Sequence, residues 1–163
     1  MAFLLWLQDS AFSTWTRESD WALFAFLIVH TIGMGFLVGT GIAVDLRLLG
    51  IAPRVPLPAL TRFMPIIGYG LIAAIASGIL LVISYPAKAL TNPLFYIKLA
   101  VLTTALLLTR ALVRRVSVDA CLDSVAPPTR SRVIAIVCLF LWIGGLTAGK
   151  FLAYTNKMLL VYQ

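Results

Sequence analysis

Charged residues are scarce in this chain of 163 residues, since Asp, Glu, Lys and Arg together make up 12% of it. That share is about half of what is usual in soluble domains. Hydrophobic residues make up 61%, and a soluble protein of this size could not keep so much apolar surface away from water. The composition therefore excludes an ordinary soluble domain and indicates a single membrane domain over residues 1–163.

Cysteine and histidine are also rare, which excludes most metal sites and disulfide frameworks. The two cysteines, Cys121 and Cys138, lack the spacing of either, so we expect reduced thiols. His30 is the only histidine. The sequence offers no pairing of nucleophile and base, no phosphate-binding loop and no metal cluster, and it leaves open whether the protein is an enzyme.

Four long apolar runs dominate the rest of the chain. They cover about residues 21–44, 63–84, 94–112 and 133–154, and each is close to or above the ~18 residues that a membrane-spanning helix needs. Because a backbone that faces lipid must satisfy its own hydrogen bonds, these runs predict helices. The predicted fold is all-α: a polytopic bundle of four transmembrane helices that contacts membrane lipid.

Residues 2–15 predict a further, amphipathic helix that lies in the membrane interface, with Trp6 and Trp15 as anchors. Its apolar and polar positions fall on opposite faces at helical spacing: Leu4, Leu7, Ala11 and Trp15 against Asp9, Ser13 and Thr14. No Lys or Arg precedes the short apolar run at residues 3–7, so this segment does not indicate a secretory signal peptide.

The basic residues predict how the bundle is oriented. Eight of the nine arginines lie between the first and second runs or between the third and fourth: Arg47, Arg54, Arg62, Arg110, Arg114, Arg115, Arg130 and Arg132. The positive-inside rule then predicts that these segments face the cytoplasm and that both termini lie on the outer side of the membrane. The same rule explains the net charge of +7, and we expect no binding to nucleic acid.

Three ionisable residues are candidates for chemistry, because burying such groups in a membrane is costly. His30, Lys98 and Lys150 are predicted to lie at similar depth, in the outer half of the bundle. A neutral imidazole can ligate haem iron, and two ammonium groups can pair with the haem propionates. The same residues could bind a quinone headgroup or a small anion. In the simplest alternative, His30 bonds a neighbouring helix and the lysines extend to the lipid headgroups.

A second axial ligand for a haem is not evident in the sequence. Met34 lies on the same helix as His30 and cannot reach the opposite face of that haem. Met158, His30 of another protomer, or an open coordination position remain as alternatives.

The other polar groups near or inside the runs are interpreted as structural. Asp45 and Arg47 mark the inner end of the first run, where we expect a structural pair or a link to the loop arginines. The hydroxyls of Ser77, Thr103 and Thr104 are expected to bond the carbonyls of their own helices.

Several segments resemble one known family. They are His30-Thr-Ile-Gly33 with Gly39, Asp45-Leu-Arg47-Leu-Leu-Gly50, Pro65 with Gly68, Ser77-Gly78, Asn92-Pro93 through Phe95 and Lys98, and Trp142 through Gly149-Lys150 to Ala153-Tyr154. Together they resemble the signature of a family of uncharacterised bacterial four-helix membrane proteins, in which we expect Arg where this chain has Lys150. The resemblance covers most of the chain and implies the architecture rather than an activity. With the predicted orientation, it also implies a place in the bacterial inner membrane, with both termini periplasmic.

Two further families are distantly similar, the membrane copper-resistance protein D family and the four-helix protoporphyrinogen oxidase. Both resemble this chain in a histidine in the first span and a lysine that opens the third. The oxidase family binds haem through the histidine that matches His30, so the resemblance implies b-type haem here. Copper handling is less favoured, because a cluster of Met, His or Cys ligands is missing from the outer side.

The leading hypothesis is therefore an inner-membrane protein that binds haem b and passes electrons to or from a periplasmic partner or a quinone. The alternative is a non-catalytic membrane subunit that anchors or organises a homo-oligomer or a larger complex, because glycine faces are abundant and reactive groups few. A small-molecule transporter is the hypothesis that the sequence favours least.

Overall fold

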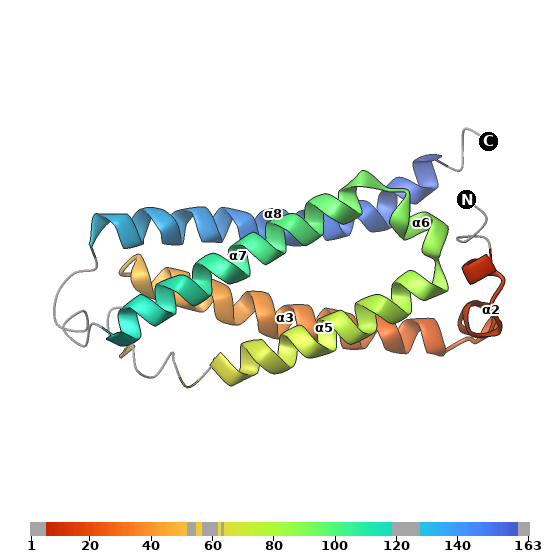
Figure 1. The fold of residues 1–163 in the computed structure, drawn as a ribbon, viewed down its shortest axis with the longest axis horizontal. Coiled ribbons are helices and arrows are strands. Elements are labelled where there is room, and N and C mark those ends of the chain that lie inside the picture. Colours follow the sequence, from red (N-terminus) through yellow and green to blue (C-terminus); the bar gives the residue numbers. More distant parts are fainter. Residues whose placement is uncertain (1–5, 52–54, 57–61, 63, 119–127, 160–163) are drawn as a thin grey trace.

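The structure, a computed structural model, describes residues 6–51, 55–56, 62, 64–118 and 128–159. Within these ranges all regular secondary structure is helical, and four helices are long and apolar enough to span a membrane. They are α3 (Ala22–Leu48), α5 (Met64–Ser84), α7 (Pro93–Val118) and α8 (Thr129–Leu159), aligned along one long axis (Figure 1). The predicted all-α fold with four membrane-spanning helices is confirmed, and the chain is an integral membrane protein.

Helices α3, α7 and α8 extend beyond the apolar runs that predicted them. The reason is that hydropathy marks only the segment inside lipid, whereas helical hydrogen bonding can continue into polar surroundings. The end of α3 is a C-terminal cap made by glycine. Gly50 has φ +86°, and the N–H groups of Gly50 and Ile51 donate to the carbonyls of Arg47 and Leu46 at 3.0 and 3.1 Å.

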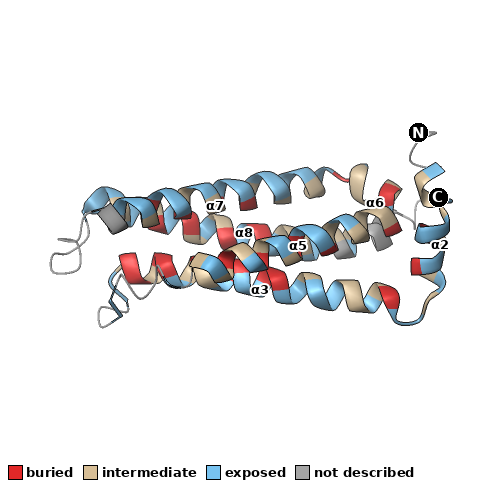
Figure 2. Ribbon diagram, turned by 60° about the horizontal axis from the view of Figure 1, so that its bottom comes forward, coloured by how far each residue is buried: buried red, intermediate tan, exposed pale blue. Residues whose placement is uncertain are grey.

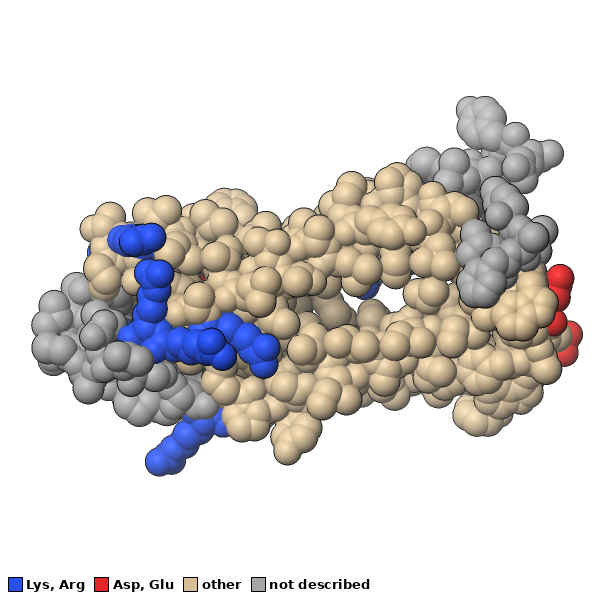
Figure 3. All heavy atoms as spheres, viewed as in Figure 1, with Lys and Arg blue, Asp and Glu red and all other residues tan. Residues whose placement is uncertain are grey.

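The two ends of the bundle differ in charge. Arg62, Arg110, Arg114, Arg115, Arg130 and Arg132 lie near the end where α3 and α7 finish and α8 begins, which we call the arginine end. In Figure 3 the basic side chains gather mainly at this end and the acidic ones lie at the other. This separation fits the predicted positive-inside arrangement.

The helix α2 (Ala11–Glu18) covers the end of the bundle opposite the arginines (Figure 1). The predicted helix 2–15 is interrupted, because residues 6–8 are helical but a turn follows, and Ser10 then caps α2 by accepting from the Ser13 N–H at 3.3 Å. Residues 2–5 lie outside the described residues. The polar face of α2 meets the bundle, since the fully buried Ser13 hydroxyl donates to the carbonyl of Ser84 at 3.1 Å. Its aromatic face is left outward, with Trp15 45% exposed.

The four long helices pack as two pairs. In one pair α3 crosses α5 where Gly33 meets Gly70, close enough that a Cβ on Gly33 would lie 2.8 Å from the backbone nitrogen of Ala74. In the other pair α7 runs along α8, and contacts of α3 with α8 join the two pairs. Figure 2 shows the buried positions facing inward and most of the outer surface exposed, as lipid-facing helices require.

Burial along α3 is uneven. Its second half carries most of the core, including Leu37, Val38, Val44 and Leu48, while residues 23–32 are exposed or half-buried. The short helix α6 (Pro86–Leu90) connects α5 to α7 at the same end as α2. The less buried half of α3 leaves room between the two helix pairs.

Candidate functional site

The imidazole of His30 points from α3 toward α5. Its Nδ1 lies 3.1 Å from the carbonyl oxygen of Ala74 and 3.1 Å from the hydroxyl of Ser77. Because a carbonyl oxygen can only accept, Nδ1 carries the hydrogen, and Nε2 therefore keeps its lone pair. Ser77 can accept from the same N–H, since its own hydrogen is donated to the Ala73 carbonyl at 2.5 Å.

Glycine makes space for this ring. A Cβ on Gly78 would stand 3.4 Å from Cε1 of His30, which is tighter than most such contacts. The glycine one residue after Ser77 thus lets α5 approach the edge of the imidazole. The ring is held on one edge, with its Nε2 directed away from α5.

The partner of Nε2 is Lys98 of α7, whose Nζ lies 3.4 Å away. An ammonium group can only donate, so this contact agrees with a lone pair on Nε2. Gly149 of α8 leaves room for the lysine, because a Cβ there would come within 3.3 Å of Cε and 3.4 Å of Nζ. Among the described residues no acidic side chain forms an ion pair with Lys98, so its charge is available to an anionic group of a ligand.

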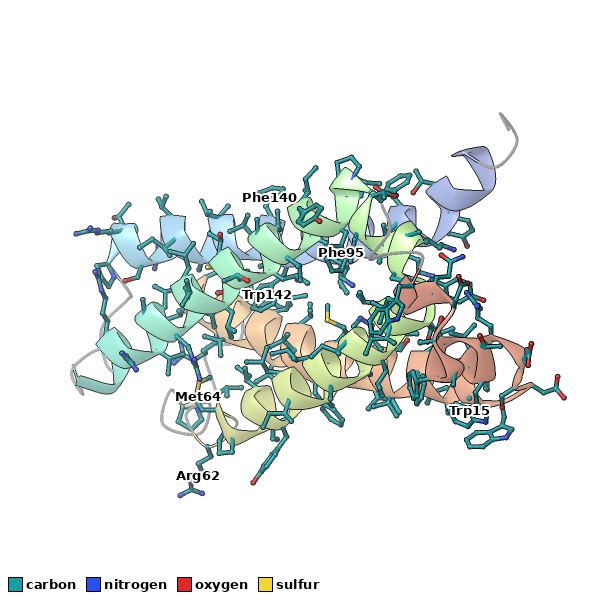
Figure 4. The ribbon with its side chains drawn as sticks, turned by 45° about the vertical axis from the view of Figure 1, so that its right-hand side comes forward. Trp15, Arg62, Met64, Phe95, Phe140 and Trp142 are labelled. Carbon is teal, nitrogen blue, oxygen red and sulfur yellow. The ribbon has the colours of Figure 1, made fainter. Side chains whose placement is uncertain are left out.

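His30 and Lys98 line a cavity of about 450 Å³ between α3, α5 and α7. The rest of its lining is almost wholly apolar, and the representative side chains are Met34, Leu71, Ile79, Phe95, Leu102 and Leu106. Figure 3 shows the opening of this hollow at the surface between α5 and α7, with blue atoms of a basic side chain inside it. Figure 4 shows Phe95 on α7 at this level of the bundle. A slot of this kind suits an apolar, flat or elongated molecule that carries a polar group.

The structure brings together two of the three residues predicted as a site. Lys150, the third, is exposed on α8 and does not line the cavity. Its neighbour Gly149 faces Lys98 instead.

The contacts of α5 with the imidazole of His30 were not predicted from the sequence. Ser77 was expected only to bond its own helix, which it does, but it also meets His30 together with the Ala74 carbonyl. No local signal could have revealed this contact, because it depends on the rotation of α5 against α3. Thr104 does bond the Ala100 carbonyl at 2.8 Å, as predicted, while Thr103 lines the cavity.

Asp45 and Arg47 do not form the expected hydrogen-bonded pair, and the alternative, a link to the loop arginines, stays a prediction. Asp45 is fully buried, and no described donor forms a hydrogen bond with either of its carboxylate oxygens. The Arg47 Nε donates instead to the carbonyl of Val55. The physical reason is that residues two apart on a helix do not share a face.

Comparisons with families of known proteins, with curated proteins and with solved structures found no match for this chain.

Proposed function

We propose that this integral membrane protein binds b-type haem in the cavity between α3, α5 and α7, with His30 as an axial ligand. The observation that carries the proposal is the hydrogen bond from Nδ1 to the Ala74 carbonyl, which leaves the Nε2 lone pair on the cavity side. Histidines that ligate metals almost always donate their other ring N–H in this way, because the bond fixes the tautomer and orients the ring. Haem bound here would supply one-electron redox chemistry.

The residues around the cavity fit such a group. The apolar lining suits a porphyrin face, and a volume of about 450 Å³ lies within the usual range for cofactor sites. Lys98 occupies the space beside Nε2 and would have to turn away from it, which its flexible stem allows. Its ammonium group would then pair with a propionate carboxylate.

The proposed iron would have one protein ligand from this chain. Met34 lines the cavity but lies one turn beyond His30 on the same helix, and the described lining holds no second His and no Cys or Tyr. Met158, the other candidate, has a side chain outside the described residues. We therefore propose an open coordination position, or one filled by a second copy of the chain.

The position of the site suggests where electrons would pass. His30 lies eight residues after the start of α3, so it is about 12 Å from that end of the helix and far from the arginine end. With the arginine end in the cytoplasm of a bacterium, the site would face the periplasmic half of the inner membrane. A periplasmic protein or a quinone could exchange electrons there.

An absorption spectrum of the protein purified in mild detergent tests the proposal. We expect a Soret band that shifts on reduction with dithionite, because the iron changes its oxidation state. A folded, fully helical protein that remains colourless after expression with added haem precursor would overturn the proposal. A colourless protein from which organic solvent extracts a quinone would assign the same cavity to a quinone headgroup held by Lys98 and His30.

A second candidate function is that of a non-catalytic subunit that organises an assembly in the membrane. It is favoured by Gly35 and Gly39 of α3, which are exposed one turn apart and have no atom of the protein near the position of a Cβ. Small residues at this spacing allow two membrane helices to approach closely. The fold of one chain does not need glycine at either position.

Leucine at both Gly35 and Gly39 is expected to separate such an assembly into single chains while leaving the fold intact, because the added side chains would point into lipid. Cross-linking in native membranes, or light scattering in detergent, measures the change. The matched control is Gly144→Leu, at an equally open glycine of α8. An unchanged mass for the double variant would contradict this role for α3.

A further inference from the structure

A second group of polar side chains is buried well away from the cavity. Asp45 of α3, Thr109 of α7 and Cys138 and Trp142 of α8 are each at most 1% exposed. Asp45 lies fifteen residues after His30, or about 22 Å along α3, toward the arginine end. Figure 4 shows Trp142 among the helices in the middle part of the bundle. The group lies where α3 of one helix pair contacts α7 and α8 of the other.

The indole of Trp142 and the carboxyl of Asp45 share one face of α3. A Cβ on Gly41 would stand 2.7 Å from the indole Nε1, so this ring lies directly against α3. Asp45 is four residues on from Gly41, and residues at this spacing are neighbours on a helix surface. Trp142 therefore lies on the Asp45 side of α3, although no hydrogen bond joins the two side chains. Cys138 is one helical turn before Trp142 on α8, and the Thr109 hydroxyl lies near its thiol.

Three of these four residues have buried polar atoms without a hydrogen-bond partner in the described part of the chain. Among the described residues no partner is within bonding geometry of the two Asp45 oxygens, the Thr109 hydroxyl or the Trp142 N–H. Burying an isolated ionised carboxylate without partners is costly. Each buried polar group that stays unpaired in a native protein needs an explanation, such as a water, an ion or a role in proton or electron transfer.

The chemistry of the group indicates which species fits. A metal cation such as Ca²⁺ takes ~6–8 oxygen ligands, whereas this group supplies one carboxylate and one hydroxyl oxygen, and no set of three His, Cys, Asp or Glu ligands occurs among the described residues. The other members offer an N–H and an S–H, which are donors. The cation that this arrangement can take is a proton on the carboxylate.

We propose that Asp45 is a proton-binding site, whose carboxyl gains and loses a proton while the bundle stays folded. Burial favours the neutral acid, which needs no counter-ion. A hydrogen bond donated by the N–H of Trp142, which lies on the same face of α3, would favour the ionised form. Both the neutral and the ionised state of Asp45 therefore have a physical basis. The proton would enter from the arginine end, because α3 ends only three residues after Asp45.

Among the charged and titratable side chains in this part of the bundle, Asp45 is the one whose protonation we expect to change with pH. Cys138 is the titratable residue that faces it from α8. On α3 itself the nearest charged residue is Arg47, two positions away, whose Nε donates to the carbonyl of Val55. On α7, Arg110 is exposed, and α5 carries only Tyr69, which is 73% exposed.

Infrared spectroscopy of the purified protein in lipid nanodiscs tests the proposal, because a protonated carboxyl has a C=O stretch well separated from that of a carboxylate. The chain has only six acidic residues, and the other five lie outside the four apolar spans. We expect one protonated carboxyl band above the pH range in which exposed carboxyls ionise, and this band should disappear as the pH rises further. The band should be missing from Asp45→Asn and unchanged in Asp20→Asn, the control at an exposed residue.

Two results would overturn the proposal. One is the absence of a protonated carboxyl band at every pH at which the protein is folded, which would mean a permanently ionised Asp45. The other is a band that persists unchanged until the protein unfolds, which would mean a permanently neutral structural group. If Asp45→Asn fails to fold, isotope labelling of aspartate in the unsubstituted protein assigns the band instead.

Discussion

Alanine in place of His30 is expected to abolish the Soret band of the purified protein while its helical content stays unchanged. The substitution removes the only imidazole in the chain, and with it the lone pair that Nε2 directs to the cavity. It also removes the hydrogen bonds to Ala74 and Ser77, each of which contributes about 1 kcal/mol to stability. The variant should therefore unfold at a somewhat lower temperature but remain a helical bundle, as circular dichroism would show.

Variants of the two lysines allow haem retention to be compared between a cation in the cavity and one outside it. Lys98→Met removes the cation that lies 3.4 Å from Nε2, so we expect haem to be retained about tenfold less well, which corresponds to ~1.4 kcal/mol. Lys150→Met removes an equal charge from the exposed face of α8 and should leave haem retention unchanged. A Soret band that survives His30→Ala would assign the iron ligand elsewhere. Equal losses in the two lysine variants would contradict a specific role of the cavity.

The difference between these lysines also shows what the sequence could predict. The rise of 1.5 Å per residue fixes how deep a residue lies in a membrane helix, so His30 and Lys98 could be placed at a common depth. It does not fix how the helix is rotated about its own axis. Lys150 has a similar depth but faces outward, because Gly149 rather than Lys150 faces α7. Rotation is set by side-chain packing between helices, which a single sequence does not reveal.

Because the rotation of a helix cannot be predicted from one sequence, the surroundings of Asp45 were not predicted either. Proximity in sequence suggested Arg47 as its partner, whereas the side chain that lies beside this face of α3 is Trp142 of α8, more than ninety residues away. The four spans, in contrast, could be read directly, since hydrophobic length alone identifies a helix that crosses a bilayer. The break in the N-terminal helix is an intermediate case. The Ser10 cap is a local signal, but apolar spacing on both sides of it suggested a continuous helix.

Alanine at Gly33 is expected to destabilise the protein and to weaken the site at the same time. The added Cβ would lie 2.8 Å from the backbone nitrogen of Ala74 and 2.9 Å from the carbonyl oxygen of Gly70. Neither backbone atom can turn aside as a flexible side chain would, so α3 must move away from α5. Overpacking of this kind costs ~1–3 kcal/mol. Because the Ala74 carbonyl also holds His30, the same movement lengthens the bond that fixes the imidazole.

Thermal unfolding in detergent, followed by circular dichroism, measures the first effect, and the haem content per chain measures the second. Gly70→Ala should behave like Gly33→Ala, since its Cβ would meet Gly33 and Leu37 of α3 at 2.9 and 3.0 Å. Gly68→Ala is the matched control, two residues earlier on α5 with open space at its Cβ position. Alanine there should be neutral or stabilising by up to ~1 kcal/mol, because it is the better helix former. Equal unfolding temperatures for all three variants would mean that α3 and α5 are not held together at these glycines. If haem were lost but the unfolding temperature stayed unchanged, the substitution would affect only the position of the imidazole and not the packing of α3 on α5.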